Sequence, residues 1–201
     1  MKAAVFHGIG DVRLEDVAEP GIRADGDAVV RITASAICGT DLHFIRGTMS
    51  GMKEGRIIGH EAIGVVEQTG PAVRNFRPGD RVVIPSTLGC GSCNYCRAGF
   101  YAQCDRINPA GKLGGTVFFG GRPEDSGGLD GLQAEYARVP HAAANLVKLP
   151  DEITDDQAIM MSDILPTSYQ AAEMAGIHPG DAVAVFGCGP VGMLAIAWHS
   201  I

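Results

Sequence analysis

GHEAIGVVEQTGPAV, residues 59–73, places a His–Glu pair directly before a short β-branched segment that ends in a glycine and a proline. Its central part, residues 62–70, has the pattern of a strand that ends in a turn. Similar segments lie at 27–37, 80–88 and 134–140, and Gly, Pro and Asp residues separate them. Short strands at this spacing predict that residues 1–150 form a mainly β domain, either a partly open barrel or a sandwich.

The composition is typical of a globular chain with a sizeable core, since 46% of its 201 residues are hydrophobic and 19% are charged. Lys and Arg number 16 against 23 Asp and Glu, a formal charge of −7. An acidic chain without a basic run argues against nucleic acid or an anionic membrane surface as a partner. The first residues, MKAAVFHGIGDV, lack the pattern of a signal peptide, and no apolar run approaches the roughly 20 residues of a membrane helix. We therefore expect a cytoplasmic protein.

The amino-acid composition of the sequence changes after Pro150. Residues 151–175 are rich in helix-forming residues, and Pro166 must begin a new helix or kink this one. The segment AVAVFG, residues 182–187, has the pattern of a short buried strand, and it runs into GCGPVG, residues 187–192. A strand, a G-x-G-x-x-G turn and a helix from Pro190 are the context of a dinucleotide-binding motif.

The most specific local motif is Cys90-x2-Cys93-x2-Cys96-x7-Cys104, in a lobe over residues 89–105. In a reducing compartment such a cluster indicates metal rather than disulfides. Four thiolates complete a tetrahedral zinc shell without an open position, which favours a structural role. An iron–sulfur cluster is an alternative, but it usually requires a last gap of about three residues and a following proline. Here the last gap is seven residues and Asp105 follows. Disulfides or free thiols are a third interpretation.

A second metal site is suggested by Cys38 and His60, which lie outside that lobe. Taken singly, a cysteine is usually a small buried hydrophobe, and a lone histidine is more often a core residue with its hydrogen bonds satisfied. Together they supply two of the ligand types found in catalytic zinc sites, which have three protein ligands and an open position.

These motifs resemble the zinc-containing alcohol dehydrogenase family of medium-chain dehydrogenases. The segment at 59–73 matches the family signature at every fixed position, and CGTDLH, residues 38–43, and the four-cysteine lobe lie where that family has them. The fixed positions are Gly59, His60, Glu61, Gly64, Gly70 and Val73. Residues 130–140 and 160–173 look most like the branch of formaldehyde dehydrogenases and bacterial secondary-alcohol dehydrogenases.

The resemblance implies a fold in two parts. A chaperonin-10-like (GroES-like) catalytic domain, a partly open barrel, would span residues 1–165. The first strand and helix of a truncated α/β Rossmann domain would span residues 166–201.

The resemblance also implies roles for individual residues. Cys38, His60 and Asp163 would bind a catalytic zinc, with Glu61 beside the metal and Asp41 orienting the imidazole of His60. A structural zinc would be bound by Cys90, Cys93, Cys96 and Cys104, which makes two zinc ions per chain. Thr40 would bond the alcohol, His43 would continue a proton relay to solvent, and Thr167 would contact a nicotinamide. The alternatives without a functional role are a turn for Thr40 and Asp41, and solvated side chains for His43 and Asp163.

The cofactor implied by the family is NAD or NADP. The residues of the phosphate-binding turn would be Gly187, Gly189, Pro190, Val191 and Gly192. Twelve residues from Pro190 to Ile201 are enough for a helix of about 18 Å. The acidic residue that holds the ribose, about 20 positions after the glycines, would lie past Ile201. We therefore expect little cofactor binding, and weak activity or none, from these 201 residues alone.

Two functions follow as hypotheses. The first is a zinc-dependent oxidoreductase that transfers hydride between a small alcohol or aldehyde and NAD(P), with the glycine-rich segment 108–131 as one wall of the pocket. The alternative is a non-catalytic zinc-binding GroES-like module that acts through oligomerisation. Without a sheet to cover, the apolar residues of the last helix should pack onto another chain or form an exposed apolar patch, which predicts a homo-oligomer. These residues are Met193, Leu194, Ile196 and Trp198.

Overall fold

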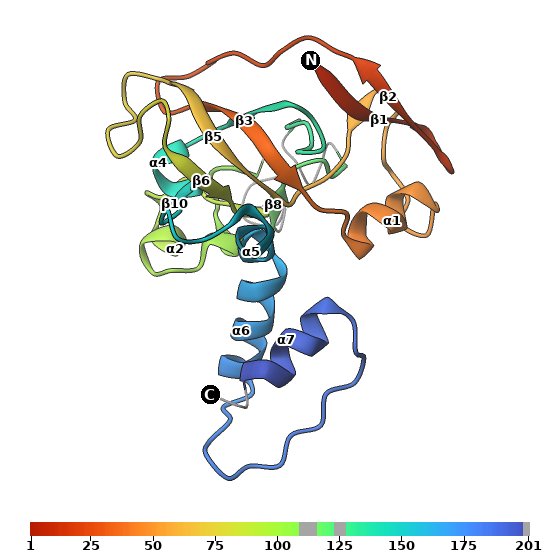
Figure 1. Ribbon diagram of the computed structural model, residues 1–201, viewed down its shortest axis with the longest axis vertical. Coiled ribbons are helices and arrows are strands. Elements are labelled where there is room, and N and C mark those ends of the chain that lie inside the picture. Colours follow the sequence, from red (N-terminus) through yellow and green to blue (C-terminus); the bar gives the residue numbers. More distant parts are fainter. Residues whose placement is uncertain (109–115, 123–127, 199–201) are drawn as a thin grey trace.

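The computed structural model describes residues 1–108, 116–122 and 128–198. Its upper part in Figure 1 holds antiparallel strands, and two helices, α6 and α7, extend away from them. A five-stranded sheet has the order β10-β6-β5-β3-β9, a three-stranded sheet has the order β2-β1-β4, and β7 pairs with β8. The strands are β1 (Lys2–Gly8), β2 (Asp11–Asp16), β3 (Ala28–Ser35), β4 (Arg56–Ile57), β5 (Ala62–Thr69), β6 (Arg81–Ile84), β7 (Thr87–Leu88), β8 (Val117–Phe118), β9 (Tyr136–Val139) and β10 (Val147–Lys148).

Short helices connect the strands, and longer ones follow them. The helical segments are α1 (Gly39–Ile45), α2 (Asn94–Arg97), η1 (Tyr101–Gln103), α4 (Ala142–Asn145), α5 (Asp155–Ala158), η3 (Ile159–Ser162), α6 (Ile164–Met174) and α7 (Pro190–Trp198). The predicted strands at 27–37, 62–70, 80–88 and 134–140 therefore correspond to β3, β5, β6 with β7, and β9. The prediction of a mainly β domain is confirmed. Of the predicted wall 108–131, residues 109–115 and 123–127 lie outside the described part of the chain.

Strand β5 lies at the centre of the five-stranded sheet, between β3 and β6. Its Gly64 faces Ile32 of β3 across a bulged stretch of the ladder. A β-carbon added at Gly64 would lie 2.2 Å from the carbonyl oxygen of Arg31 and 2.7 Å from a methyl carbon of Val30. Only glycine allows this close approach of two backbones, which explains the residue type at this position.

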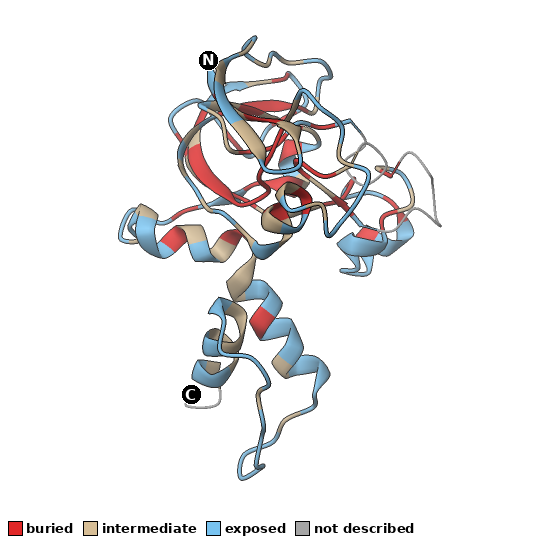
Figure 2. Cartoon of the chain, turned by 90° about the vertical axis from the view of Figure 1, so that its right-hand side faces the viewer, coloured by how far each residue is buried: buried red, intermediate tan, exposed pale blue. Residues whose placement is uncertain are grey.

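The core lies in the strand-containing part of the chain, where Figure 2 shows the buried residues concentrated. Alternate residues of β3, β5 and β6 point into it, as the two-residue period of a strand requires. The largest cluster of buried apolar residues also includes members from the β7–β8 ladder, β9 and α4. It contains Ala28, Val30, Ala62, Val66, Val73, Phe76, Val82, Ile84, Leu88, Val117, Phe119, Leu129, Leu132, Ala137, Val139, Ala142 and Leu146.

The predicted helical region after Pro150 consists of α5, η3 and α6, which are separated at Asp163. Thr154 and Gln157 form a capping box that starts α5: the Gln157 N–H donates to the Thr154 hydroxyl, and the Thr154 N–H donates to the Gln157 side-chain oxygen. Pro166 lies in the first turn of α6, where a backbone N–H has no helical partner and its loss costs little. The expectation that Pro166 begins a new helix is therefore confirmed.

The prediction of a strand over residues 182–187 is wrong. Those residues have no strand assignment, and all of them except Val185 are exposed. A strand is stable only when neighbouring strands pair with its backbone, and among the described residues no ladder includes this segment. The helix predicted from Pro190 is present as α7.

Helix α7 packs on α6 of the same chain. The Trp198 ring meets the Tyr169 ring edge to face at 5.1 Å, and the Trp198 indole N–H donates to the Ser168 hydroxyl at 3.1 Å. Leu194 and Trp198 are thereby half-buried, whereas Met193 and Ile196 are exposed. Part of the apolar face of α7 is thus covered within the chain, and the rest forms an exposed patch, which is one of the two expected arrangements. Among the described residues, no helix combines the length and apolar character that a membrane crossing needs.

We predict that Gly64→Ala lowers the free energy of unfolding by about 3 kcal/mol or more, because the new methyl group forces β3 and β5 apart. Chemical denaturation followed by circular dichroism measures this change. Gly21→Ala is the matched control, since a β-carbon there meets nothing within 4 Å, and its effect should be under about 0.5 kcal/mol. Equal stability of the two variants would show that the β3–β5 spacing is not tightly constrained.

Candidate metal centres

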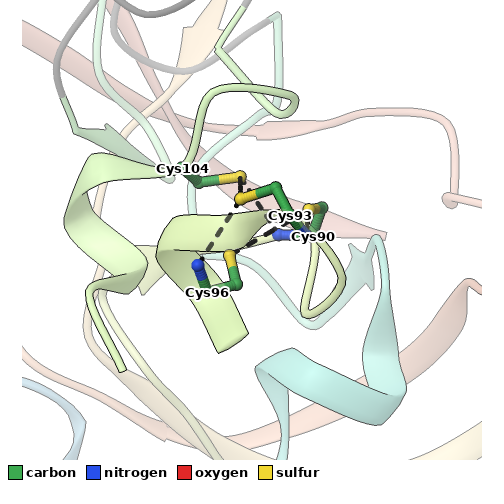
Figure 3. Close-up of side chains that lie close together, drawn as sticks. All are labelled: Cys90, Cys93, Cys96 and Cys104. Carbon is green, nitrogen blue, oxygen red and sulfur yellow. Dashed lines mark hydrogen bonds between the residues drawn. The ribbon is translucent and has the colours of Figure 1, made fainter. Parts of the chain in front are cut away.

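The four lobe cysteines lie together and are all buried. Their sulfur atoms point toward one another (Figure 3) and lie within 4.8 Å of each other. The Cys90 and Cys96 sulfurs are 4.0 Å apart, and the Cys93 and Cys104 sulfurs are 3.9 Å apart. Four sulfurs at about 2.3 Å from a central zinc lie about 3.8 Å apart in a tetrahedron. These two distances match that spacing, and sulfurs that all lie within 4.8 Å of one another can close around a zinc ion by shifts of about 1 Å or less.

The backbone of the lobe stabilises negative charge on the sulfurs. The N–H groups of Ser92 and Cys93 donate to the Cys90 sulfur, and the N–H of Cys90 donates to the Cys104 sulfur. Burial alone would raise the pKa of Cys90, but these donors and the Ser92 hydroxyl lower that pKa to about 6. The pKa of Cys96 is raised, chiefly by its burial. A thiolate is the form that binds metal, so the lobe presents at least one sulfur already poised to bind.

A buried amide attaches this lobe to the barrel. Asn145, the last residue of α4, is 1% exposed, and its side chain accepts from the Gly89 N–H at 2.9 Å. Its amide nitrogen donates to the carbonyl oxygens of Gly89 at 2.8 Å and Pro140 at 2.9 Å. Gly89 directly precedes Cys90, so the amide orients the entry to the four-cysteine cluster. Sequence reasoning missed Asn145, because its lobe partner, Gly89, lies 56 residues away along the chain.

The second group of ligands brings together Cys38, His60, Glu61 and Asp163, with one ligand atom of each within 4.8 Å of the others. His60 and Glu61 lie directly before β5, Cys38 directly before α1, and Asp163 between η3 and α6. The donor set comprises a thiol, an imidazole and two carboxylates, which is a combination that binds zinc. If three of these residues held a zinc ion, one coordination position would stay open, whereas the four-cysteine cluster would leave none.

Asp41 connects two of those residues. Its carboxylate accepts from the Cys38 N–H at 2.9 Å and lies 3.2 Å from the Nδ1 atom of His60. Burial lowers the pKa of His60, but the hydrogen bonds and charges of Asp41 and Cys38 outweigh this and raise it to about 10. The negative groups around His60 therefore favour a positive charge at this site. With Nδ1 held by Asp41, the Nε2 atom is the one that faces the cluster, where it lies 3.5 Å from Asp163.

Ser162 holds Asp163 in this position. Its hydroxyl donates to the Ile84 carbonyl oxygen at 2.6 Å and accepts from the Ala62 N–H at 3.1 Å, and its own carbonyl oxygen accepts from the Ser86 N–H. One small side chain thus joins η3 to the ends of β5 and β6. Ser162 was also absent from the sequence prediction, because a serine in a helical pattern carries no signal of such long-range contacts.

Glu61 is the polar group that fits a cation best. Its side chain is buried, and its Oε1 atom has no hydrogen-bond partner among the described residues. Burial and the nearby Asp163 raise its pKa. An orphaned buried carboxylate oxygen is costly without a compensating charge, so a metal ion in this group would satisfy an oxygen that is otherwise unpaired.

The remaining predicted residues lie at different distances from this group. Thr40 and His43 share one face of α1 at a spacing of three residues, and the Thr40 hydroxyl is 3.8 Å from the Cys38 sulfur. His43 is exposed, and its Nδ1 atom is 2.7 Å from the Thr48 hydroxyl. The Thr167 hydroxyl donates to Asp163 at 2.8 Å.

The glycine-rich turn at 187–192 contributes no residue to either ligand group among the described residues, and its Cys188 is exposed. Gly187 has a φ of +96°, which favours glycine, and a β-carbon on Gly192 would lie 1.9 Å from the Gly187 carbonyl oxygen. Around Gly189 the space is open. The turn therefore has the close backbone packing expected of the motif, although no sheet supports it among the described strands.

The antiparallel β fold, with two groups of residues that could each hold a metal ion, defines a domain of the GroES-like type. Residues 24–151 match the family described as "Alcohol dehydrogenase GroES-like domain", and the chain belongs to this family. The resemblance drawn from residues 38–43 and 59–73 is thereby confirmed.

Relatives agree with this assignment. A zinc-type alcohol dehydrogenase-like protein of Bacillus subtilis is 40% identical over 97% of this chain and 51% of its own length. A glutathione-independent formaldehyde dehydrogenase of Pseudomonas aeruginosa is 36% identical over 98% of this chain and 50% of its own length. Among solved structures, an alcohol dehydrogenase from Thermus sp. ATN1 superposes with a TM-score of 0.91 at 38% identity, covering 100% of this chain and 55% of that one. The chain thus spans about half the length of these relatives.

We predict that Asn145→Ala loosens the lobe, because it leaves the N–H and carbonyl groups of Gly89 buried without partners. The free energy of unfolding of the zinc-loaded protein should fall by about 2–4 kcal/mol. Release of zinc from the lobe, followed with a colorimetric chelator, should also accelerate. Asn94→Ala, an exposed change on the same lobe, is the control and should alter neither quantity. Unchanged zinc release from Asn145→Ala would refute the attachment role.

Proposed function

We propose that this chain is the zinc-binding catalytic part of an oxidoreductase that transfers hydride between a small alcohol or aldehyde and NAD(P). The observation that carries the proposal is the open group of Cys38, His60 and Asp163, with ligand atoms within 4.8 Å of one another and an unpaired Glu61 oxygen beside them. A site with three protein ligands and a free position is the catalytic type of zinc site. Membership in the alcohol dehydrogenase GroES-like family supports this reading.

Cys38, His60 and Asp163 would hold one zinc, and the four lobe cysteines would hold a second. When bound at the open group, zinc acts as a Lewis acid that polarises the alcohol oxygen and lowers the pKa of that alcohol. A Cys38 thiolate, a neutral His60 and an Asp163 carboxylate sum to −2, which balances Zn²⁺. Asp41 keeps His60 in the tautomer that presents Nε2, and Glu61 supplies a further carboxylate beside the metal.

The proton and the hydride need separate routes. Thr40 would accept a hydrogen bond from the alcohol, and His43, one helical turn further along α1, would pass the proton to solvent. Thr167, held by Asp163 at 2.8 Å, would contact the nicotinamide ring. The turn of Gly187, Gly189, Pro190, Val191 and Gly192 would receive the pyrophosphate at the start of α7.

In this proposal residues 1–165 are the catalytic domain and residues 166–201 begin the dinucleotide-binding domain. The exposed apolar residues of α7, Met193 and Ile196, would pack against another copy of the chain.

The first prediction from the proposed function concerns how strongly each zinc ion is held. A carboxylate in place of a second thiolate makes the open group the harder ligand set, so its zinc should leave first when a chelator is added. Zinc release is followed with a colorimetric indicator. Asp163→Cys should slow this first phase and leave the phase of the four-cysteine lobe unchanged. Loss of the lobe zinc first would contradict the assigned ligand sets.

The second prediction tests whether the open group accepts a ligand. Metal analysis should give two zinc ions per chain, and Cys38→Ser should reduce this to one. After replacement of zinc by Co²⁺, imidazole should shift the visible sulfur-to-cobalt bands of the parent protein, because the open group has a free position. The same addition should leave the Cys38→Ser spectrum unchanged. A single metal per chain, or bands that imidazole does not move, would favour a non-catalytic GroES-like module.

Turnover is a separate measurement on the same preparations. Ethanol, 2-propanol or formaldehyde with NAD or NADP should give little or no reduced cofactor from these 201 residues, because none of the described strands pairs beside the glycine-rich turn. Absorbance at the wavelength of reduced nicotinamide is the readout. Calorimetry with NAD and NADP is the companion test, and micromolar affinity together with rapid turnover would show that the turn at 187–192 binds the cofactor without that sheet.

A further inference from the structure

A cavity of about 640 Å³ lies next to the open metal group, and Ser162, Asp163 and Thr167 form part of its wall. The four-cysteine lobe contributes residues 99–103, and the remainder of the wall comes from residues 85–87, the end of α4, β10 and the first half of α6. Since the Asp163 carboxylate is 3.5 Å from the Nε2 atom of His60, one end of the cavity adjoins the ligand group directly.

Large apolar side chains line this cavity although they are otherwise exposed. Phe100 is 62% exposed, Val147 is 55% exposed and Tyr101 is 40% exposed, and all three belong to the cavity wall. They come from two separate parts of the chain, η1 with its preceding residue and β10. Exposed apolar groups that converge on one hollow are typical of a ligand site rather than of an ordinary surface.

The lining residues also restrict the charge of a ligand. Of the described residues that line the cavity, Asp163 alone carries a formal charge, and the other polar groups are hydroxyls and amides such as Thr87 and Gln170. A carboxylate or phosphate on the part of a ligand that lies away from the metal end would therefore meet no compensating cation among these lining residues, and its desolvation would not be compensated. Neutral ligands avoid this cost.

The size of the cavity argues against a one-carbon ligand. Ligand sites for small organic molecules span about 300–1,000 Å³, and the cavity lies within that range. Methanol or hydrated formaldehyde is not much larger than a water molecule, whose share of liquid volume is about 30 Å³. Such a ligand would leave the apolar wall in contact with water, whereas a ring or branched chain would cover it.

We propose that this cavity receives the body of the substrate, and that it selects uncharged alcohols or aldehydes carrying an aromatic or branched apolar group. The reacting oxygen would lie at the Asp163 end, and the apolar group would contact Phe100, Tyr101 and Val147. The inference rests on the proposed function for the identity of the reacting group, but the binding preference belongs to the cavity itself.

Ligand-observed NMR on the zinc-loaded chain tests the preference without turnover. The probes are benzyl alcohol, its charged analogue 4-(hydroxymethyl)benzoate, and methanol. Benzyl alcohol should bind at least tenfold more tightly than either of the others. Gln170 lies on the same face of α6 as Thr167, three residues beyond it, and both line the cavity with Asp163. Gln170→Trp should fill part of the space and weaken benzyl alcohol binding by tenfold or more.

Ala171→Trp is the matched control, because Ala171 is exposed on the same helix and is outside the cavity wall. It should leave benzyl alcohol binding within twofold of the parent chain, and circular dichroism should show both variants folded. Equal binding of benzyl alcohol and methanol, tight binding of the benzoate, or insensitivity to Gln170→Trp would overturn the assignment. Selective binding that Gln170→Trp weakens, in a protein whose open group holds no metal, would support the cavity assignment and count against the proposed function.

Discussion

The carboxylate of Asp41 joins the two parts of the chain on which the open metal group depends. It is 1% exposed, and it accepts from the Cys38 backbone, faces the His60 ring and receives the Gln133 amide at 3.5 Å. A buried carboxylate is tolerated only when its oxygens are satisfied in this way. The requirement fixes the start of α1 against the residues that precede β5, and so it sets the positions of a thiol and an imidazole that are 22 residues apart in the sequence.

The position of the third ligand residue, Asp163, depends on the register of the sheet. Ile63 of β5 pairs with Val83 of β6, which brings the Ala62 N–H and the Ile84 carbonyl oxygen to the same edge, where the Ser162 hydroxyl binds both. Because a shift of one residue would invert every side chain of a strand, the position of Asp163 follows from the apolar pattern of β5 and β6. The ligand group is thus a consequence of sheet geometry as much as of the ligands themselves.

This dependence explains what the sequence could and could not predict. The strands around β5 were predictable because their apolar residues and turns are local signals, and the four cysteines were predictable because a stretch of 15 residues contains all of them. Asn145 and Ser162 were not, since their partners are defined only after folding. The segment 182–187 shows the opposite failure: its composition favours a strand, but pairing comes from other segments, and no described strand lies beside it.

The two ligand groups are also connected through the cavity between them. Cys96 and Cys104 flank the aromatic residues Phe100 and Tyr101, so the geometry of the closed cluster determines where one wall of the cavity stands. Asn145 fixes the entry to the lobe and also lines that cavity, while Asp163 belongs both to the cavity wall and to the open group. A metal ion in the lobe would therefore act on ligand selection as well as on stability, because it would hold Phe100 and Tyr101 at a constant distance from Asp163. If the cavity binds the substrate as proposed, the four-cysteine cluster would contribute to the specificity of the neighbouring site, even though none of its cysteines lines the cavity.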